Sequence, residues 1–360
     1  MFEQSVVGQA RALRTLRRVL GGERMPHAML FYGPEETGKV AAALETARSL
    51  HCDDGSAGAC NTCRSCRKTA AMNHPDFSVL LPFPVRTSQE AEWDLVQKVI
   101  EDPYGYPALE RSATISVDRI RELQRRFSYG SYEGAWRTAV ILHADQMRPE
   151  GANALLKTLE EPPDRSLLLL TAHSVEALLP TLVSRCQAVK YPALSSQEVS
   201  GALVNRWSIG ADVADFVARA SGGNLRRAIA QADADLEDIQ DRAYRFLEAL
   251  IWGEEYPTYA ALENLASDRQ KAIGLLEASG IWLRDVLVYS HGGRPQVLHH
   301  SRLEDLERLS HVFDLERLSQ ALGKVQSLLD MNQRHVNLLV GLVSFWRQLR
   351  GFTSTRPTAS

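Results

Sequence analysis

The segment from Gly33 to Val40 carries the residues best suited to binding a phosphate group. Its sequence, GPEETGKV, lies between an apolar run of strand character at 27–32 and strong helix formers at 41–45. A glycine-rich turn in this context directs backbone N–H groups and the positive end of a helix at phosphate, and Lys39 can reach the outer phosphate oxygens. The pattern predicts a P-loop, with nucleotide contacts from Gly33, Thr37, Gly38 and Lys39.

Two residues of this loop do not suit a working nucleotide site. A P-loop has Ser or Thr after the lysine, because that hydroxyl is a ligand of Mg²⁺. Here the position holds Val40, which has no oxygen. Glu36 also places a carboxylate close to where phosphate charge would lie. The loop therefore predicts a nucleotide site that has lost its metal ligand.

Four cysteines follow the P-loop at short spacing: Cys52, Cys60, Cys63 and Cys66. Four thiolates can surround one Zn²⁺ as a tetrahedron, with metal–sulfur distances near ~2.3 Å. The segment at 53–58 is too polar and glycine-rich to fold by burial alone, so a metal would supply its folding energy. We predict a structural zinc ion. A redox Cys-x-x-Cys pair is the alternative, a catalytic zinc is disfavoured because no ligand position stays open, and His51 ranks below the cysteines as a ligand.

Composition limits the class of protein. The chain has 360 residues, of which 44% are hydrophobic and 24% charged, and this suggests two or three globular domains. The formal net charge of −3 gives no global basic signature for nucleic-acid binding. No apolar run approaches the ~18 residues of a membrane span, and no signal peptide is visible. We therefore expect a cytoplasmic protein, in which clustered cysteines favour metal over disulfides.

The elements that must position these residues alternate between strand and helix. Apolar runs predict buried strands at 27–32, within 74–82, and at 137–143, 166–171 and 188–191. Helical patterns cover 5–24, 116–128 and 153–161. This alternation is typical of a parallel α/β sheet. The stretch at 83–113 resembles an insertion or lid, and its residues suggest no chemistry.

From residue 195 onward the sequence has helical patterns only. We predict an α/β domain at 1–193 with a zinc module at about 51–68, a helical lid domain at 194–235, a C-terminal helical oligomerisation domain at 236–352 and a disordered tail at 353–360. The helix around 331–349 has apolar side chains on more than one side. That pattern is typical of a helix packed within a domain or against a partner subunit.

Several stretches together resemble one family, the bacterial sliding-clamp loaders of DNA polymerase III, which are AAA+ proteins. They are the P-loop, the cysteine insertion, ANALLKTLEEPP at 152–163, LLPTLVSRCQ at 178–187 and GGNLRRAI at 222–229. The resemblance covers roughly 5–230 and, more loosely, the helical C-terminal region. It implies an AAA+ P-loop α/β domain with a zinc insertion, a small helical lid and a C-terminal helical collar.

The resemblance also locates the catalytic carboxylates of active members. In those proteins the central strand ends in an Asp-Glu pair, which serves Mg²⁺ and the attacking water. The matching positions hold Leu142 and His143, or His143 and Ala144 if one residue is skipped. Asp145 comes too late for the first role, and we expect it to face elsewhere. With Val40, three metal- or water-handling groups are missing, so no intrinsic ATPase is expected, unlike in the motor subunits (gamma/tau).

The resemblance assigns roles to two arginines. Arg185, in Ser184-Arg185-Cys186, matches an arginine that projects into a neighbouring subunit's ATP site, where it stabilises charge in the transition state. The alternative is that Arg185 pairs within its own domain. Arg226 matches a sensor that faces nucleotide in cis, and Thr171 lies near the first-sensor position. Cys186 is then a packed residue rather than a fifth metal ligand.

Together these implications describe a non-catalytic subunit with a vestigial or weak site for ATP or ADP. Its expected partners are the motor subunits (gamma/tau), the delta subunit and, through the complex, the sliding clamp and primed DNA. Two alternatives stay open: an active clamp-loader ATPase, and a zinc-dependent DNA-binding module. The net charge of −3 argues against strong autonomous DNA binding.

Overall fold

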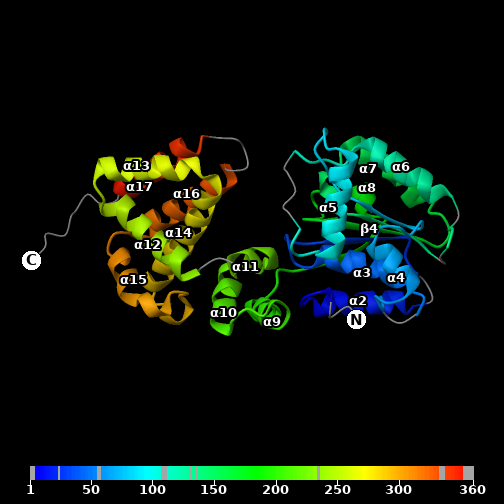
Figure 1. The fold of residues 1–360 in the computed structure, drawn as a ribbon, viewed down its shortest axis with the longest axis horizontal. Coiled ribbons are helices and arrows are strands. Elements are labelled where there is room, and N and C mark those ends of the chain that lie inside the picture. The colour runs from blue at the N-terminus through cyan, green and yellow to red at the C-terminus, as the bar shows by residue number, and fades with distance from the viewer. Residues whose placement is uncertain are drawn as a thin grey trace, which may run out of the picture. The chain divides into compact units, whose positions relative to one another are not determined.

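The structure is a computed structural model that describes residues 5–22, 25–54, 58–106, 112–129, 131–133, 136–232, 236–331 and 337–351. It divides into two compact units, Met1–Ala230 and Gln231–Ser360 (Figure 1). The predicted disordered tail at 353–360 lies outside the described residues. The helices at 194–230 belong to the same unit as the sheet, and the finer division into sheet domain and lid domain stays a prediction.

The first unit is built on a five-stranded parallel sheet. Its strands are β1 (Ala28–Tyr32), β2 (Phe77–Leu80), β3 (Arg137–Ile141), β4 (Ser166–Ala172) and β5 (Gln187–Lys190), in the order β2-β3-β4-β1-β5. The three central strands are almost wholly buried, as expected for apolar runs covered on both faces. The predicted α/β class is therefore confirmed.

Helices cover both faces of the sheet. The first unit contains α2 (Ala10–Leu20), α3 (Lys39–His51), α4 (Arg64–Ala70), α5 (Gln89–Glu101), α6 (Val117–Ser128), α7 (Pro149–Glu160) and α8 (Pro180–Val183). Helices α6, α7 and α8 pack on one face through an apolar cluster that includes Ile120, Leu155 and Leu182. Helix α3 packs against β1, β3 and β4 from the opposite side (Figure 1). This arrangement buries α3 and fixes the loop that precedes it.

Three further helices follow the sheet: α9 (Ser196–Trp207), α10 (Ala211–Ala220) and α11 (Leu225–Ala232). Helix α9 begins with a capping box in which the Ser195 hydroxyl accepts the Glu198 N–H. Helices α9 and α10 pack closely against each other. Helix α11 begins beside the P-loop, because the Leu225 N–H donates to the Glu36 carbonyl oxygen at 3.4 Å.

The second unit is helical, as predicted. It contains α12 (Leu236–Trp252), α13 (Glu255–Ser267), α14 (Arg269–Ser290), α15 (Leu303–Ser310), α16 (Leu315–Met331) and α17 (Leu338–Gly351), with short 3₁₀ turns at Arg294–Gln296 and His300–Arg302. Helix α14 packs against α12, α15 and α16 around an apolar core. Among the described residues of both units, no helix is long and apolar enough to cross a membrane.

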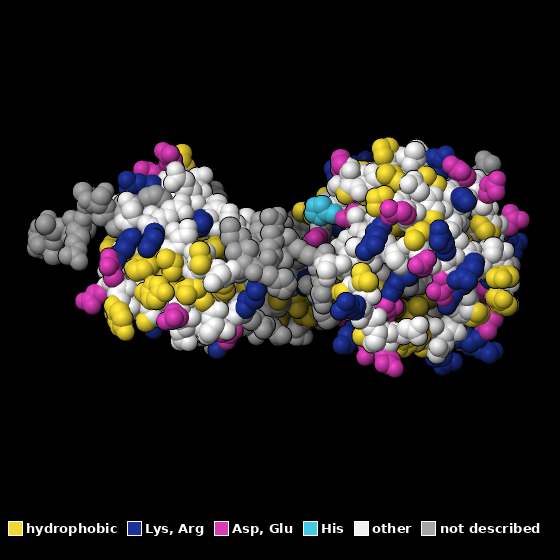
Figure 2. Space-filling model, turned by 90° about the horizontal axis from the view of Figure 1, so that it is seen from above, with side chains coloured by type: hydrophobic (Ala, Val, Ile, Leu, Met, Phe, Trp, Pro, Cys, Tyr) yellow, Lys and Arg dark blue, Asp and Glu magenta, His cyan; other side chains and the backbone are white. Residues whose placement is uncertain are grey.

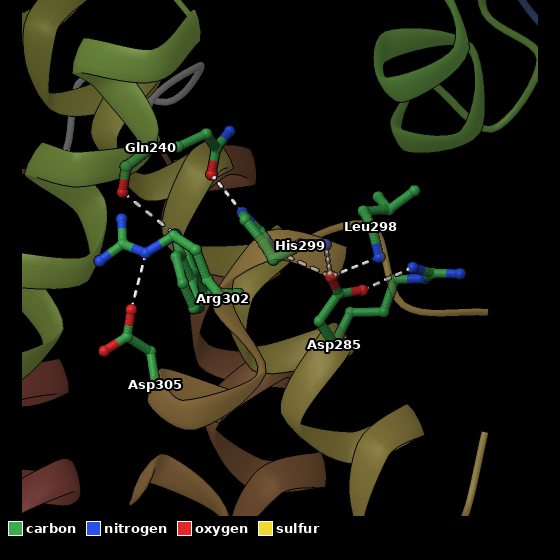
Figure 3. Close-up of polar contacts among 8 residues, drawn as sticks. Gln240, Asp285, Leu298, His299, Arg302 and Asp305 are labelled. Atoms are coloured by element: carbon green, nitrogen blue, oxygen red, sulfur yellow. Dashed lines mark hydrogen bonds and ion pairs between the residues drawn. The ribbon is translucent and has the colours of Figure 1, made fainter. Parts of the chain in front are cut away.

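A buried polar cluster joins three segments of the second unit (Figure 3). The Asp285 carboxylate is fully buried and accepts the backbone N–H groups of Leu298 (2.6 Å) and His299 (2.9 Å). The His299 ring lies between Asp285 (Nδ1, 2.8 Å) and the Gln240 side-chain oxygen (Nε2, 3.0 Å), and it stacks on Trp282 with 3.9 Å between centroids. The cluster therefore ties the segment after α14 to α14 and α12.

Candidate functional site

The P-loop lies between β1 and α3, as the sequence predicts. Gly33 and Gly38 have φ values of 148° and 94°, which favour glycine. A Cβ at Gly33 would lie 1.9 Å from the Tyr191 carbonyl oxygen, so the strand–loop junction has no space for a side chain. The Thr37 hydroxyl donates to the Pro34 carbonyl at 3.0 Å. The loop therefore has the glycine-dependent turn that a phosphate cradle needs.

The Lys39 ammonium is held by the loop itself. Its Nζ donates to the Gly33 carbonyl at 2.8 Å and also to the Pro34 carbonyl. The side chain is buried, and this burial lowers the pKa of Lys39 to about 8. The lysine thus has protein partners at the place where it would otherwise reach phosphate oxygens.

Glu36 and Arg226 form an ion pair above the loop. The Glu36 Oε1 lies 2.9 Å from the Arg226 Nη2, and the two side chains are 11% and 22% exposed. Burial raises the pKa of Glu36 to about 7, although Arg226 and Lys39 act in the opposite direction. The structure thus brings Arg226 to the P-loop, as the resemblance implies, and its partner there is a carboxylate of the same chain.

Two tyrosines that sequence reasoning missed fill the space beside the loop. Tyr104 and Tyr106 belong to the stretch at 83–113 and are only 1% and 3% exposed. The Arg226 guanidinium lies 4.0 Å over the Tyr106 ring, and the Tyr104 hydroxyl accepts the Val7 N–H at 3.0 Å. The signal in the sequence was two aromatic residues within the Pro/Gly segment at 103–107. Their contacts with the P-loop are tertiary, so local patterns do not reveal them.

The cavity that remains at the P-loop has a volume of about 40 Å³. Its lining includes Glu36, Lys39, Val40 and Tyr106. A volume of this size holds a few water molecules at most, whereas small-molecule pockets usually measure ~300–1,000 Å³. The cavity beside the loop is therefore much smaller than a usual small-molecule pocket.

The end of β3 lacks the carboxylate pair of active members. Leu142 is fully buried, and the His143 N–H donates to the Thr171 hydroxyl at 2.9 Å. Burial lowers the pKa of His143, and its ring Nε2 lies 3.2 Å from the Tyr106 hydroxyl. Asp145 requires a correction, because it lines the remnant cavity instead of facing elsewhere. The short 3₁₀ turn Ala144–Gln146 carries it back toward the loop.

The four predicted cysteines come together. The sulfur atoms of Cys52, Cys60, Cys63 and Cys66 all lie within 4.8 Å of one another, with 3.9 Å between those of Cys60 and Cys66. A tetrahedral site with ~2.3 Å zinc–sulfur bonds places its sulfurs roughly 3.8 Å apart. The Cys60 sulfur accepts the Cys63 N–H at 3.3 Å, and the Cys63 sulfur accepts the Cys66 N–H at 3.3 Å. The cluster can hold a metal ion.

The pKa differs from one thiol of the cluster to another. The Thr62 hydroxyl and backbone N–H groups lower the pKa of Cys60 to about 6, whereas burial raises the pKa of Cys66. His51 bonds Thr138 at 2.8 Å and is not among the clustered residues. Cys186 packs with the apolar residues under α7 and α8, and burial raises its pKa to about 12. Its place outside the cluster agrees with a packed residue.

Arg185 follows α8 and pairs within its own domain. Its Nη1 donates to the Thr181 carbonyl at 2.9 Å, and its Nη2 donates to the Glu160 carboxylate at 2.8 Å. The side chains of Arg185 and Glu160 are 35% and 50% exposed. The guanidinium therefore has a partner in cis while staying accessible at the surface.

The face of the first unit shown in Figure 2 carries no continuous basic patch. There, the Lys and Arg side chains of the first unit are interspersed with Asp and Glu. Hydrophobic side chains of the second unit gather on the part of its surface that Figure 2 shows. Its exposed hydrophobic residues include Tyr256 and Tyr259 on α13 and Val340 on α17, which are 84%, 42% and 63% exposed.

Comparison with known proteins places the chain in a family. The sequence model described as "DNA polymerase III, delta subunit" matches residues 8–195, more than half of the chain. A Bacillus subtilis protein named DNA polymerase III subunit delta' is 30% identical over 224 residues, or 62% of this chain and 58% of that protein. The delta' subunit of Pseudomonas aeruginosa is 36% identical over 181 residues, or 49% and 47%.

A solved structure is similar at lower identity. It is a DNA polymerase III gamma subunit-related protein from Thermotoga maritima, with a TM-score of 0.43 and 15% identity, covering 94% of this chain and 99% of that chain. The chain spans about half the length of the curated relatives it matches. The family match and the two delta' relatives show that the chain belongs to the DNA polymerase III delta subunit family.

Proposed function

We propose that this chain is a non-catalytic subunit of the sliding-clamp loader in DNA replication. It assembles with motor ATPase subunits (gamma/tau) and the delta subunit, and it donates Arg185 to a neighbour's ATP site while the complex loads a clamp onto primed DNA. The observation that carries this proposal is the P-loop, where Lys39 is bound by carbonyl oxygens beside a cavity of about 40 Å³.

Three residues support the absence of intrinsic ATPase activity. Val40 offers no ligand to Mg²⁺, and Leu142 and His143 occupy the positions of the carboxylate pair. Phosphoryl transfer depends on metal and positioned charges, so losing several of them removes most of the rate enhancement. Asp145 lines the cavity together with Val40, which has no hydroxyl to complete a metal site.

The exposed position of Arg185 supports its role in trans. Its pair with Glu160 lies at the surface, and such ion pairs contribute about 0–1 kcal/mol. A neighbour's γ-phosphate carries more charge than one carboxylate and accepts bidentate hydrogen bonds from a guanidinium. The guanidinium can therefore exchange Glu160 for phosphate at little cost when two subunits meet.

The remaining parts of the proposal concern structure and assembly. The four-thiolate cluster holds a structural Zn²⁺, whose ligand set leaves no position open for a reaction. Tyr256, Tyr259 and Val340 give the second unit exposed apolar surface of the kind that packs against partner subunits. Residual affinity for ATP or ADP in cis is weak or absent, because Glu36 and Tyr106 occupy the space.

The proposal is tested with purified protein and a reconstituted complex. We expect the isolated chain to hydrolyse no ATP above background, and we expect clamp loading on primed DNA by motor subunits to fail when this chain is left out. Turnover by the isolated chain that is lost in a Lys39→Ala variant would contradict the proposal. Loading that proceeds at full rate without the chain would contradict it as well.

A further inference from the structure

We propose that Glu36 acts as a built-in substitute for a nucleotide phosphate, holding Arg226 and thereby fixing α11 on the P-loop without any ligand. The inference deepens the proposed function and rests on its account of the P-loop as an empty site. It assigns a positioning role to a residue whose carboxylate otherwise looks like a defect of the loop.

The first observation is that Glu36 binds two consecutive residues of α11. Its carbonyl oxygen accepts the Leu225 N–H at 3.4 Å, and its carboxylate lies 2.9 Å from the Arg226 Nη2. Glu36 itself has a φ of 55°, the left-handed conformation that non-glycine residues rarely adopt. Both the backbone and the side chain of Glu36 thus contact the start of α11.

The second observation is the charge that surrounds the carboxylate. Arg226 and Lys39 are the two cations that act on Glu36, and Glu35 is the nearby anion. A P-loop followed by a helix N-terminus is a site for an anion, and a guanidinium binds carboxylate and phosphate in the same way. The negative charge for which this site is built therefore comes from the chain.

The third observation is that the neighbouring tyrosines reach the same helices. The Arg226 Nε donates to the Tyr104 carbonyl at 3.4 Å, and its guanidinium lies over the Tyr106 ring. The Tyr104 ring meets Trp207, the last residue of α9, edge-on at 6.2 Å, and the Arg206 guanidinium lies 5.2 Å over it. The segment at 104–106 thus connects the P-loop to α9 as well as to α11.

These contacts make the position of α9–α11 independent of ATP. A bound nucleotide can leave, and helices that it holds are then released. The Glu36 side chain is part of the chain, so its contacts with α11 do not depend on the nucleotide concentration. Removing Glu36 from this partly buried ion pair leaves the Arg226 guanidinium without its counter-ion, which is unfavourable.

Hydrogen exchange of the full chain tests the proposal at pH 8, above the pKa of about 7 for Glu36. In Glu36→Gln, we expect the amides of α11 to exchange about tenfold faster, in line with the loss of the ion pair with Arg226. Amides of α6 and α7, on the far face of the sheet, should not change. The matched control is Glu35→Gln, since Glu35 is an exposed carboxylate next in the chain and its loss should leave α11 unaffected.

A double variant and an added anion separate this role from general destabilisation. Arg226→Gln should speed exchange as Glu36→Gln does, and the double variant should be no worse than either alone. In Glu36→Gly, where glycine suits the φ of 55°, millimolar pyrophosphate should slow α11 exchange again, and it should have no effect on the wild type. Unchanged α11 exchange in Glu36→Gln would overturn the proposal, and so would additive effects in the double variant. Pyrophosphate that fails to slow α11 exchange in Glu36→Gly would overturn it as well.

The exchange experiment and the ATPase measurement test the two proposals separately. ATP turnover by the wild-type chain would contradict the proposed function and leave the exchange results standing. Unchanged α11 exchange would remove the role of Glu36 and leave the assignment of a non-catalytic subunit intact.

Discussion

At the scale of single residues, Lys39 and Glu36 of the P-loop each have a partner within this chain. Lys39 donates to the carbonyls of its own loop, and Glu36 binds Arg226. Burying these charges costs more than their mutual attraction returns in many proteins, so such a pair fixes an arrangement rather than adding stability. The pKa of Glu36, raised to about 7 by burial, agrees with this view.

The buried carboxylate of Asp285, in the core of the second unit, predicts an effect on stability. Its carboxylate accepts two backbone N–H groups and the His299 ring, all buried, so Asp285→Ala should lower the free energy of unfolding by about 3–5 kcal/mol. Asp305, whose ion pair with Arg302 is partly exposed, is the matched control (Figure 3). Asp305→Ala should cost about 1 kcal/mol or less. Equal losses in urea unfolding would contradict the structural role of the buried cluster.

At the scale of elements, we predict that the four-cysteine segment around α4 depends on a bound metal ion. We expect the purified chain to contain about one zinc ion, and Cys60→Ser to lose it, because the cluster has no ligand to spare. Amide exchange in α4 should then rise while the central strands stay protected. Cys186→Ser, which lies outside the cluster, should keep the metal. Metal analysis that finds no zinc in the wild type would contradict the four-thiolate site.

The elements also show what the sequence can predict. The central strands β1, β3 and β4 are continuous apolar runs, and the glycines of the P-loop identify its turn, so both were found from local patterns. The cysteine cluster was found from spacing. The packing of Tyr104 and Tyr106 into the nucleotide pocket was missed, because residues far apart in the chain make that contact. The predicted direction of Asp145 was wrong for the same reason, since it depends on a turn after β3.

At the scale of the whole molecule, the chain combines a small P-loop cavity with an accessible arginine. The cavity at the P-loop is small, about 40 Å³, while the Arg185 guanidinium contacts exposed partners. Under the proposed function, a subunit of this kind contributes to catalysis only through a neighbour. That proposal places the chemical role of the chain at the surface near α8, and it depends on what Arg185 does in the assembled complex.

The most direct test is the DNA-stimulated ATP turnover of the reconstituted clamp loader with Arg185→Ala in this chain. We predict that the complex assembles and that turnover falls, because an arginine supplied in trans contributes about 10³–10⁵ in rate at the site it completes. Glu160→Ala, which frees the guanidinium without removing it, should keep turnover at or above the wild-type rate. Wild-type turnover with Arg185→Ala in a fully assembled complex would contradict the account.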